Sequence, residues 1–146
     1  MTKRKIRASL AAAAVATALT AVAVPSTAHA STAAPRTSAA ADGYLYAWTN
    51  LNRGGSYCRW YGDDDDWSTC SPGGYMQDQA SSVENRGYAG AYGDVKLFKN
   101  IGYDASAGYS CLDNGQYLNN LANYYWSNGT GMNDSITSHY WVTGCV

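Results

Sequence analysis

The chain carries the same oxygen-rich loop motif twice, 56 residues apart. The copies read Gln77-Asp78-Gln79-Ala80-Ser81-Ser82 and Asn133-Asp134-Ser135-Ile136-Thr137-Ser138. Each has an acid, two variable residues and a pair of hydroxyl side chains. The stretches Gly55–Cys58 and Gly108–Cys111 also match, as Gly-x-x-Cys at an offset of 53 residues. This repeat predicts two similar structural units of about 50 residues each.

The N-terminus has the features of a secretory signal peptide. Lys3, Arg4, Lys5 and Arg7 precede an apolar run, and Ala28-His29-Ala30 is a small-x-small cleavage site. The apolar run is too short and too weakly apolar to span a bilayer. We therefore predict a signal peptide over residues 1–30 and a secreted, extracellular protein without a membrane anchor.

The remainder is predicted to be one domain preceded by a short segment. Residues 31–41 are rich in Ser, Thr, Ala and Pro, which is typical of a flexible linker or pro-segment. Residues 42–146 have the length of a single small domain. The repeat divides this domain at about residue 92, into units 42–92 and 93–146.

Charge and composition restrict the function of this domain. Four of the ten basic residues lie in the signal peptide, which leaves six basic residues against eleven acidic ones. That balance argues against nucleic acid and against an anionic membrane as partners. We expect a monomer.

The pattern of residues favours strands over helices. Tyr44–Trp48 and Asp94–Lys99 have strand-like composition, and each is followed by Asn and a Gly-containing turn. Residues 117–126 could support a short helical turn. We therefore expect an all-β sandwich of two four-stranded Greek keys.

The four cysteines of the domain are Cys58, Cys70, Cys111 and Cys145. An even number in an exported domain predicts two disulfides, for which three pairings are possible. We favour Cys58 with Cys70 and Cys111 with Cys145, because each bridge then closes within one half of the domain.

Taken together, these motifs resemble the βγ-crystallin superfamily, including the exported bacterial members that act as small metalloproteinase inhibitors. The family hairpin has an aromatic, four residues, another aromatic and then x-Gly, and Phe98-x4-Tyr103-x-Ala105 matches it except at the last position. Tyr46-x4-Leu51 is interpreted as a looser first copy. The family calcium motif is Asn/Asp-Asn/Asp-x-x-Ser/Thr-Ser; residues 133–138 satisfy it fully, and residues 77–82 satisfy all but its first position.

The resemblance implies up to two weakly bound Ca²⁺ ions shared between the loops. The implied ligands are the carbonyls of Gln79 and Ser135 and the hydroxyls of Ser81 and Thr137, with Asp78 and Asp134 supplying charge. Oxygen donors of this kind suit a hard cation. Ser82 and Ser138 are expected to hold the folded hairpins instead. The alternative, that both motifs are only structural turns, remains open.

Two further features of the sequence are candidate sites. The run Asp63–Asp66 is most simply a solvated loop, although a flanking disulfide would make it a rigid acidic loop able to meet a cation or a basic partner. His139 is the single histidine beyond the signal peptide, so a multi-histidine zinc site cannot form. No nucleophile motif accompanies it, and we predict that the protein is not an enzyme.

The resulting hypothesis is a secreted, calcium-binding βγ-crystallin-like protein that resembles extracellular peptidase inhibitors. The candidate inhibitory loops are Gly62–Trp67 and Gly102–Gly108. The alternatives are a secreted antimicrobial or killer protein and a carbohydrate-binding module, for which the nineteen aromatic residues give weak support.

Overall fold

The computed structural model describes residues 39–145. The predicted signal peptide and most of the segment 31–41 lie outside the described residues, so these two predictions stay predictions.

The described residues form eight β-strands and three short 3₁₀ turns, as predicted for an all-β chain. The strands are β1 (Tyr44–Asn50), β2 (Gly54–Trp60), β3 (Ser71–Pro72), β4 (Ser82–Arg86), β5 (Asp94–Phe98), β6 (Tyr109–Leu112), β7 (Tyr117–Leu118) and β8 (Ser138–Val142). The turns are η1 (Leu51–Arg53), η2 (Ala105–Ala107) and η3 (Leu121–Asn123). The strands expected at 44–48 and 94–99 are confirmed as β1 and β5, and η3 is the helical turn expected within 117–126.

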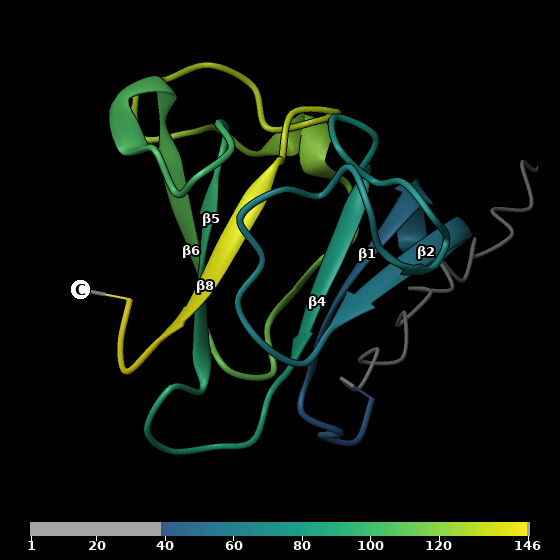
Figure 1. Cartoon of the computed structure of the whole chain (residues 1–146), viewed down its shortest axis with the longest axis vertical. Helices are drawn as coiled ribbons and strands as arrows, with labels where there is room; N and C mark the ends of the chain where they lie inside the picture. Colours follow the sequence, from purple (N-terminus) through teal and green to yellow (C-terminus); the bar gives the residue numbers. More distant parts are fainter. Residues whose placement is uncertain (1–38, 146) are drawn as a thin grey trace, which may run out of the picture. The chain divides into compact units, whose positions relative to one another are not determined.

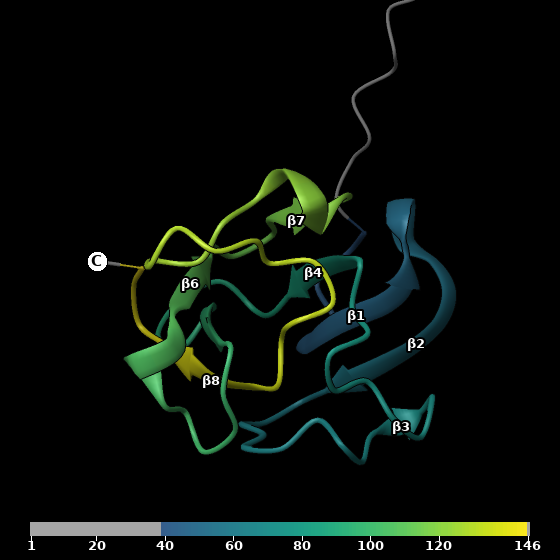
Figure 2. The same cartoon turned by 90° about the horizontal axis from the view of Figure 1, so that it is seen from above.

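The strands form two antiparallel sheets, which are both visible in Figure 1. One sheet has the order β3-β2-β1-β4-β7 and the other the order β6-β5-β8. Figure 2 shows β7, from the second half of the chain, beside β4 from the first half. Conversely, Asp64 of the first half forms an isolated bridge with His139 on β8. Each half therefore contributes backbone to the sheet of the other.

Alternation along the strands builds the core between the sheets. Leu45 and Ala47 on β1, and Val95 and Leu97 on β5, are fully buried and belong to one hydrophobic cluster. Successive side chains of a strand point to opposite faces. The polar and aromatic residues between them consequently form the outer faces of the two sheets.

Backbone contacts show which residues of the two halves are equivalent. The amide of Ser81 donates to Trp48 O (2.8 Å), and the amide of Thr137 donates to Phe98 O (3.0 Å). Trp48, and not Tyr46, thus occupies the place of Phe98. The first hairpin has the same spacing as the second, and its interpretation as a looser copy starting at Tyr46 is wrong.

The Gly-x-x-Cys match is a coincidence of sequence. Cys58 pairs with Ala47 of β1 and is fully buried, whereas Cys111 pairs with Lys96 of β5. The two cysteines therefore lie on opposite faces of their sheets. Ala47 corresponds to Leu97, which pairs with Ser110, so Cys58 corresponds to Ser110 and not to Cys111. In a strand a shift by one residue reverses the face.

The two disulfides join Cys58 to Cys70 and Cys111 to Cys145, which is the pairing favoured from the sequence. The Cys58–Cys70 bridge encloses the acidic run. Asp63 and Asp65 are exposed, as expected of a solvated loop. The backbone of Asp64, however, exchanges hydrogen bonds with His139 (2.8 and 3.0 Å), so this part of the run lies at a strand edge.

Candidate metal centre

The two predicted calcium loops lie against each other. The amide of Asp78 donates to Ile136 O (3.2 Å), and the amide of Asp134 donates to Ala80 O (3.0 Å). Both aspartates have left-handed backbone conformations, with φ of 55° and 51°. Equivalent residues 56 positions apart thus make reciprocal contacts, and the structure brings both copies of the motif into one site.

The hydroxyls predicted as ligands are placed on the facing loops. Ser81 Oγ donates to Asp134 Oδ1 (3.3 Å), and Thr137 Oγ1 donates to Lys99 O (3.0 Å). Each hydroxyl proton has an acceptor, which leaves the oxygen lone pairs available to a cation. Asp134 also accepts a hydrogen bond from Asn133 Nδ2 (2.6 Å), which orients its carboxylate.

The remaining implied ligands differ in their side-chain contacts. Ser135 Oγ accepts from Trp126 Nε1 (2.9 Å) and donates to Met132 O (2.8 Å), so its hydroxyl is committed to the protein. Ser135 can offer its carbonyl oxygen alone, which is the role that the resemblance implies. Gln79 is exposed, and its amide donates to Met76 O (3.1 Å).

Ser82 and Ser138 hold the hairpins, as the resemblance implied. Ser82 Oγ accepts the amide of Arg53 (3.0 Å), and Ser138 Oγ accepts the amide of Tyr103 (3.2 Å). Each hydroxyl also donates to a carbonyl of the same hairpin, at 2.7 and 2.6 Å. Both serines are fully buried, and these four hydrogen bonds fold the hairpins over their sheets.

Charge in the site is unequal between the loops. Partial burial raises the pKa of Asp78, while the positive charge of Lys99 opposes that rise. The equivalent of Lys99 in the first hairpin is the uncharged Thr49. One side of the paired loops therefore already has a cation near its carboxylate, which disfavours a second cation there.

A different acidic group lies elsewhere in the described part of the chain. The ligand atoms of Asp94, Asp113 and Cys145 lie within 4.8 Å of one another. Cys145 is bonded to Cys111 and has no thiolate to offer. The paired calcium loops do not form a cluster of acidic, histidine or cysteine side chains of this kind, because backbone carbonyls and hydroxyls make up most of their oxygen donors.

The candidate inhibitory loops are also neighbours. The amide of Gly102 donates to Asp65 O (2.8 Å), which joins Gly62–Trp67 to Gly102–Gly108. Partial burial raises the pKa of Tyr103, and the carboxylates of the acidic run raise it further. The two loops thus form one acidic surface.

His139 is fully buried and has no access to a substrate. Its Nδ1 accepts from Trp67 Nε1 (2.9 Å), and its Nε2 lies 3.0 Å from Gly62 O. The ring is therefore neutral with its proton on Nε2, and burial lowers its pKa to about 3. Both nitrogens are therefore used within the protein.

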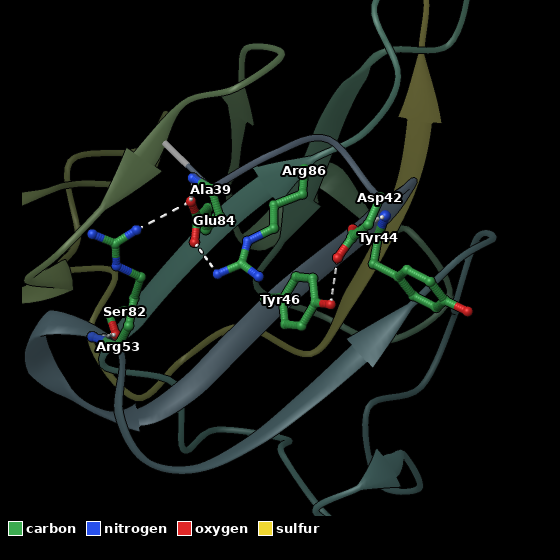
Figure 3. A network of polar contacts seen from close by, with 8 residues as sticks. All are labelled: Ala39, Asp42, Tyr44, Tyr46, Arg53, Ser82, Glu84 and Arg86. Carbon is green, nitrogen blue, oxygen red and sulfur yellow. Dashed lines mark hydrogen bonds and ion pairs between the residues drawn. The ribbon is translucent and has the colours of Figure 1, made fainter. Parts of the chain in front are cut away.

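Sequence reasoning missed a charged network on the outer face of the larger sheet (Figure 3). Glu84 on β4 is fully buried and binds Arg53 (3.1 Å) and Arg86 (2.7 Å). Its Oε1 also accepts the amide of Ala39 (3.1 Å). The arginines and the Ala39 amide outweigh burial and lower the pKa of Glu84. The alternation of side chains along β4 could have placed Glu84 on this face. No local sequence pattern links Glu84 to Arg53 and Ala39, because these partners are 31 and 45 positions away in the sequence.

The larger sheet also carries cation–π contacts. The guanidinium of Arg86 lies 4.3 Å from the ring centroid of Tyr46, and that of Arg53 lies 4.7 Å from that of Tyr117. Tyr46 donates a hydrogen bond to Asp42 (2.7 Å). This face is therefore tied to the segment that precedes β1.

Within the described residues, no helix has the length and apolar character required to cross a bilayer.

No family model matches the sequence, and no curated protein matches it. Several solved structures are similar to the described part of the chain. A domain from work on the evolution of the eye lens βγ-crystallin domain fold has a TM-score of 0.51 and 20% identity, covering 70% of this chain and 87% of that one. A βγ-crystallin from Ciona intestinalis has a TM-score of 0.50 and 16% identity, covering 68% of this chain and 99% of that one. The described part of the chain therefore has the βγ-crystallin fold, a sandwich of two Greek keys.

Proposed function

We propose that the protein is a secreted, non-enzymatic βγ-crystallin-like module that binds Ca²⁺ at the paired loops. The reciprocal backbone contacts of Asp78 and Asp134 carry this proposal, because they bring two all-oxygen donor sets together. Hard cations prefer carboxylate, hydroxyl and carbonyl oxygens. The predicted signal peptide and the two disulfides support an extracellular setting, where calcium is plentiful and disulfides persist.

The affinity should be low. The pair of loops has two carboxylates, those of Asp78 and Asp134. The positive charge of Lys99 opposes the binding of a cation beside Asp78. Dissociation constants of about 10⁻⁴ to 10⁻³ M are typical of extracellular modules with few charged ligands. The site that uses Ser81 and the Ser135 carbonyl should bind more tightly than the site that uses Thr137 and the Gln79 carbonyl.

Calorimetric titration of the chain from residue 31 onward tests the proposal. Calcium should bind saturably, and the double variant Ser81→Ala with Thr137→Ala should lose the binding while keeping its fold. Thr143→Ala, an exposed threonine just beyond β8, is the matched control and should bind as the parent does. Heat of binding that persists unchanged in the double variant would show that these loops are only turns.

We further propose that the acidic surface formed by Gly62–Trp67 and Gly102–Gly108 binds an extracellular partner, and a peptidase is the class that the sequence resemblance implies. The hydrogen bond between Gly102 and Asp65 supports this, because it couples two loops into one pre-organised surface. Inhibition assays against secreted metallo-, serine and cysteine peptidases should find a target. Gly102→Pro removes the amide donor and cannot adopt the φ of 69° found at Gly102, so it should separate the two loops and weaken that inhibition. A lack of inhibition across the panel would leave the killer-type and carbohydrate-binding alternatives.

A further inference from the structure

A cleft of about 430 Å³ lies at the opposite ends of β4 and β8 from the calcium loops. The calcium motifs end at Ser82 and Ser138, the first residues of these strands, whereas Gly87 follows β4 and Trp141 is near the end of β8. Aromatic rings dominate its lining: Tyr61, Tyr88, Tyr92 and Trp141, with the Asp63 carboxylate beside them. Three of these rings are strongly exposed, at 64%, 58% and 67% for the tyrosines in that order. The volume is within the usual range for a small-ligand site.

Two glycines allow the rings to stand where they do. A Cβ added at Gly43 would lie 2.8 Å from the ring carbons of both Tyr61 and Tyr88. A Cβ added at Gly87 would lie 2.5 Å from the ring of Trp141. Any larger residue at either position would push the rings apart, so the arrangement of the aromatic side chains depends on the backbone beneath them.

The loop that carries two of the tyrosines is fixed at both ends. The side-chain amide of Asn85 donates to Gly93 O (2.8 Å), and that of Asn114 donates to Gly87 O (2.9 Å) and to Gly93 O (3.2 Å). Asn85 is fully buried. Tyr92 has a left-handed backbone with φ of 59°, which is uncommon for a bulky residue and persists only where surrounding contacts impose it. The loop therefore presents its rings in a pre-organised position.

The charge of the cleft selects the ligand. Asp63 Oδ1 accepts the amide of Trp141 (2.8 Å), which holds the carboxylate at the rim. Lysine and arginine are both absent from the described residues that line the cleft. Elsewhere the protein places its own cations on aromatic faces: Lys96 Nζ lies 4.2 Å from the ring centroid of Tyr109. The cleft likewise brings aromatic rings and a carboxylate together.

From this geometry we propose that the cleft binds the alkylammonium group of an organic cation. Ring faces attract ammonium groups through their negative quadrupole, and a cluster of rings with a carboxylate supplies the same attraction from several sides. The Asp63 carboxylate contributes a full negative charge. The methylene or methyl groups of the ligand are surrounded by the rings of Tyr61, Tyr88, Tyr92 and Trp141. The proposal is independent of the calcium loops, and calcium should leave the binding unchanged.

Titrations followed by NMR chemical shifts test the proposal on the chain from residue 31 onward. Choline should shift the indole signal of Trp141, and its uncharged isostere 3,3-dimethylbutan-1-ol should bind at least about tenfold more weakly. N-acetyl-lysine methylamide provides the second arm, because tighter binding than choline would indicate that the ammonium group comes from a protein side chain. Equal binding of choline and its isostere would overturn the proposal. Binding of a neutral oligosaccharide in place of both ammonium compounds would overturn it as well.

Single-residue variants test whether choline binds in this cleft. Asp63→Asn keeps an oxygen for the Trp141 amide but removes the charge, and it should weaken choline binding severalfold without weakening binding of the isostere. Tyr92→Ala should abolish detectable binding, whereas Tyr125→Ala, an equally exposed tyrosine outside the cleft lining, should not change it. If Asp63→Asn and Tyr92→Ala both bind choline as the parent does, the cleft is not the site.

Discussion

At the scale of single residues, His139 couples the fold to pH. It is buried with a neutral ring, held by Trp67 and Gly62. Its pKa is about 3 in the folded protein against 6.5 as the ordinary value. Between these two values the unfolded chain binds the proton and the folded chain does not. His139 therefore lowers stability as pH falls below 6.5, and its full contribution is present only above that value.

We predict that the free energy of unfolding falls by about 1.4 kcal/mol per pH unit between pH 6 and 5 because of this one group. Chemical denaturation at several pH values measures the slope. His139→Gln does not titrate and should flatten the curve in this window, even though the variant is less stable overall. Below about pH 4.5 the lowered pKa of Glu84 adds a second loss, because its carboxylate becomes protonated in the unfolded chain first. A slope that is identical in the variant would contradict the assignment to His139.

Lys99 is the residue that we expect to limit the proposed calcium affinity most. Its charge acts on Asp78, and its carbonyl accepts the Thr137 hydroxyl. Lys99→Thr copies the residue of the first hairpin and keeps the carbonyl. We expect it to raise calcium affinity by about two- to fivefold, since a charge interaction at an exposed site contributes roughly 0.2–1 kcal/mol.

Calorimetric titration with calcium measures this change. Lys96→Thr is the matched control, because Lys96 packs on Tyr109 and should leave the affinity unaltered. An affinity that rises equally in both variants would show a general effect of net charge and not a local one.

At the scale of elements, the sequence predicts those features whose cause is local. The strand-like composition of 44–48 and 94–99 depends on a few neighbouring residues, and it predicted strands that the structure contains. The Asp-x-x-Ser/Thr-Ser spacing is equally local, and through the family resemblance it implied paired loops, which the structure also contains. The register of the first hairpin was predicted wrongly, because Tyr46 and Trp48 are both aromatic and only the contact of Ser81 with Trp48 distinguishes them. The Glu84 network and the aromatic cleft were missed because their members are distant in sequence.

The segment before β1 is part of the sheet's outer face and not only a linker. The amide of Ala39 donates to Glu84 (Figure 3). The amides of Asp42 and Gly43 both donate to Arg86 O, at 2.9 and 2.8 Å. We predict that a chain beginning at residue 42 has a free energy of unfolding about 1.5–3 kcal/mol lower than that of a chain beginning at residue 35, because a hydrogen bond to a charged group contributes roughly this much.

Urea denaturation of the two chains at pH 7 measures the difference. The comparison should be repeated with Glu84→Gln in both, where the loss should shrink because the acceptor is no longer charged. Equal stability of the two natural chains would show that the contact of Ala39 contributes nothing to the fold.

At the scale of the whole molecule, the two halves are interlocked. β7 extends the sheet of the first half through its pairing with β4, and Asp64 extends the sheet of the second half through its bridge with His139. The paired calcium loops also join residues of both halves. Neither half can satisfy its sheet edge or bury its core residues alone, so the domain should fold as one cooperative unit.

We predict that residues 35–92 and 93–146, prepared as separate chains, are each unfolded and that they associate into a folded complex when mixed. Calcium should tighten this complex, because an ion bound between the loops binds only the assembled state and stabilises it by mass action. NMR spectra of each half and of the mixture measure folding, and titration of one half into the other with and without calcium measures the association. The Ser81→Ala and Thr137→Ala changes should abolish the calcium effect while leaving association itself intact. Dispersed spectra from either half alone would show that exchange of strands is not required for folding, and the duplicated units would then be independent modules whose contact serves the metal site alone.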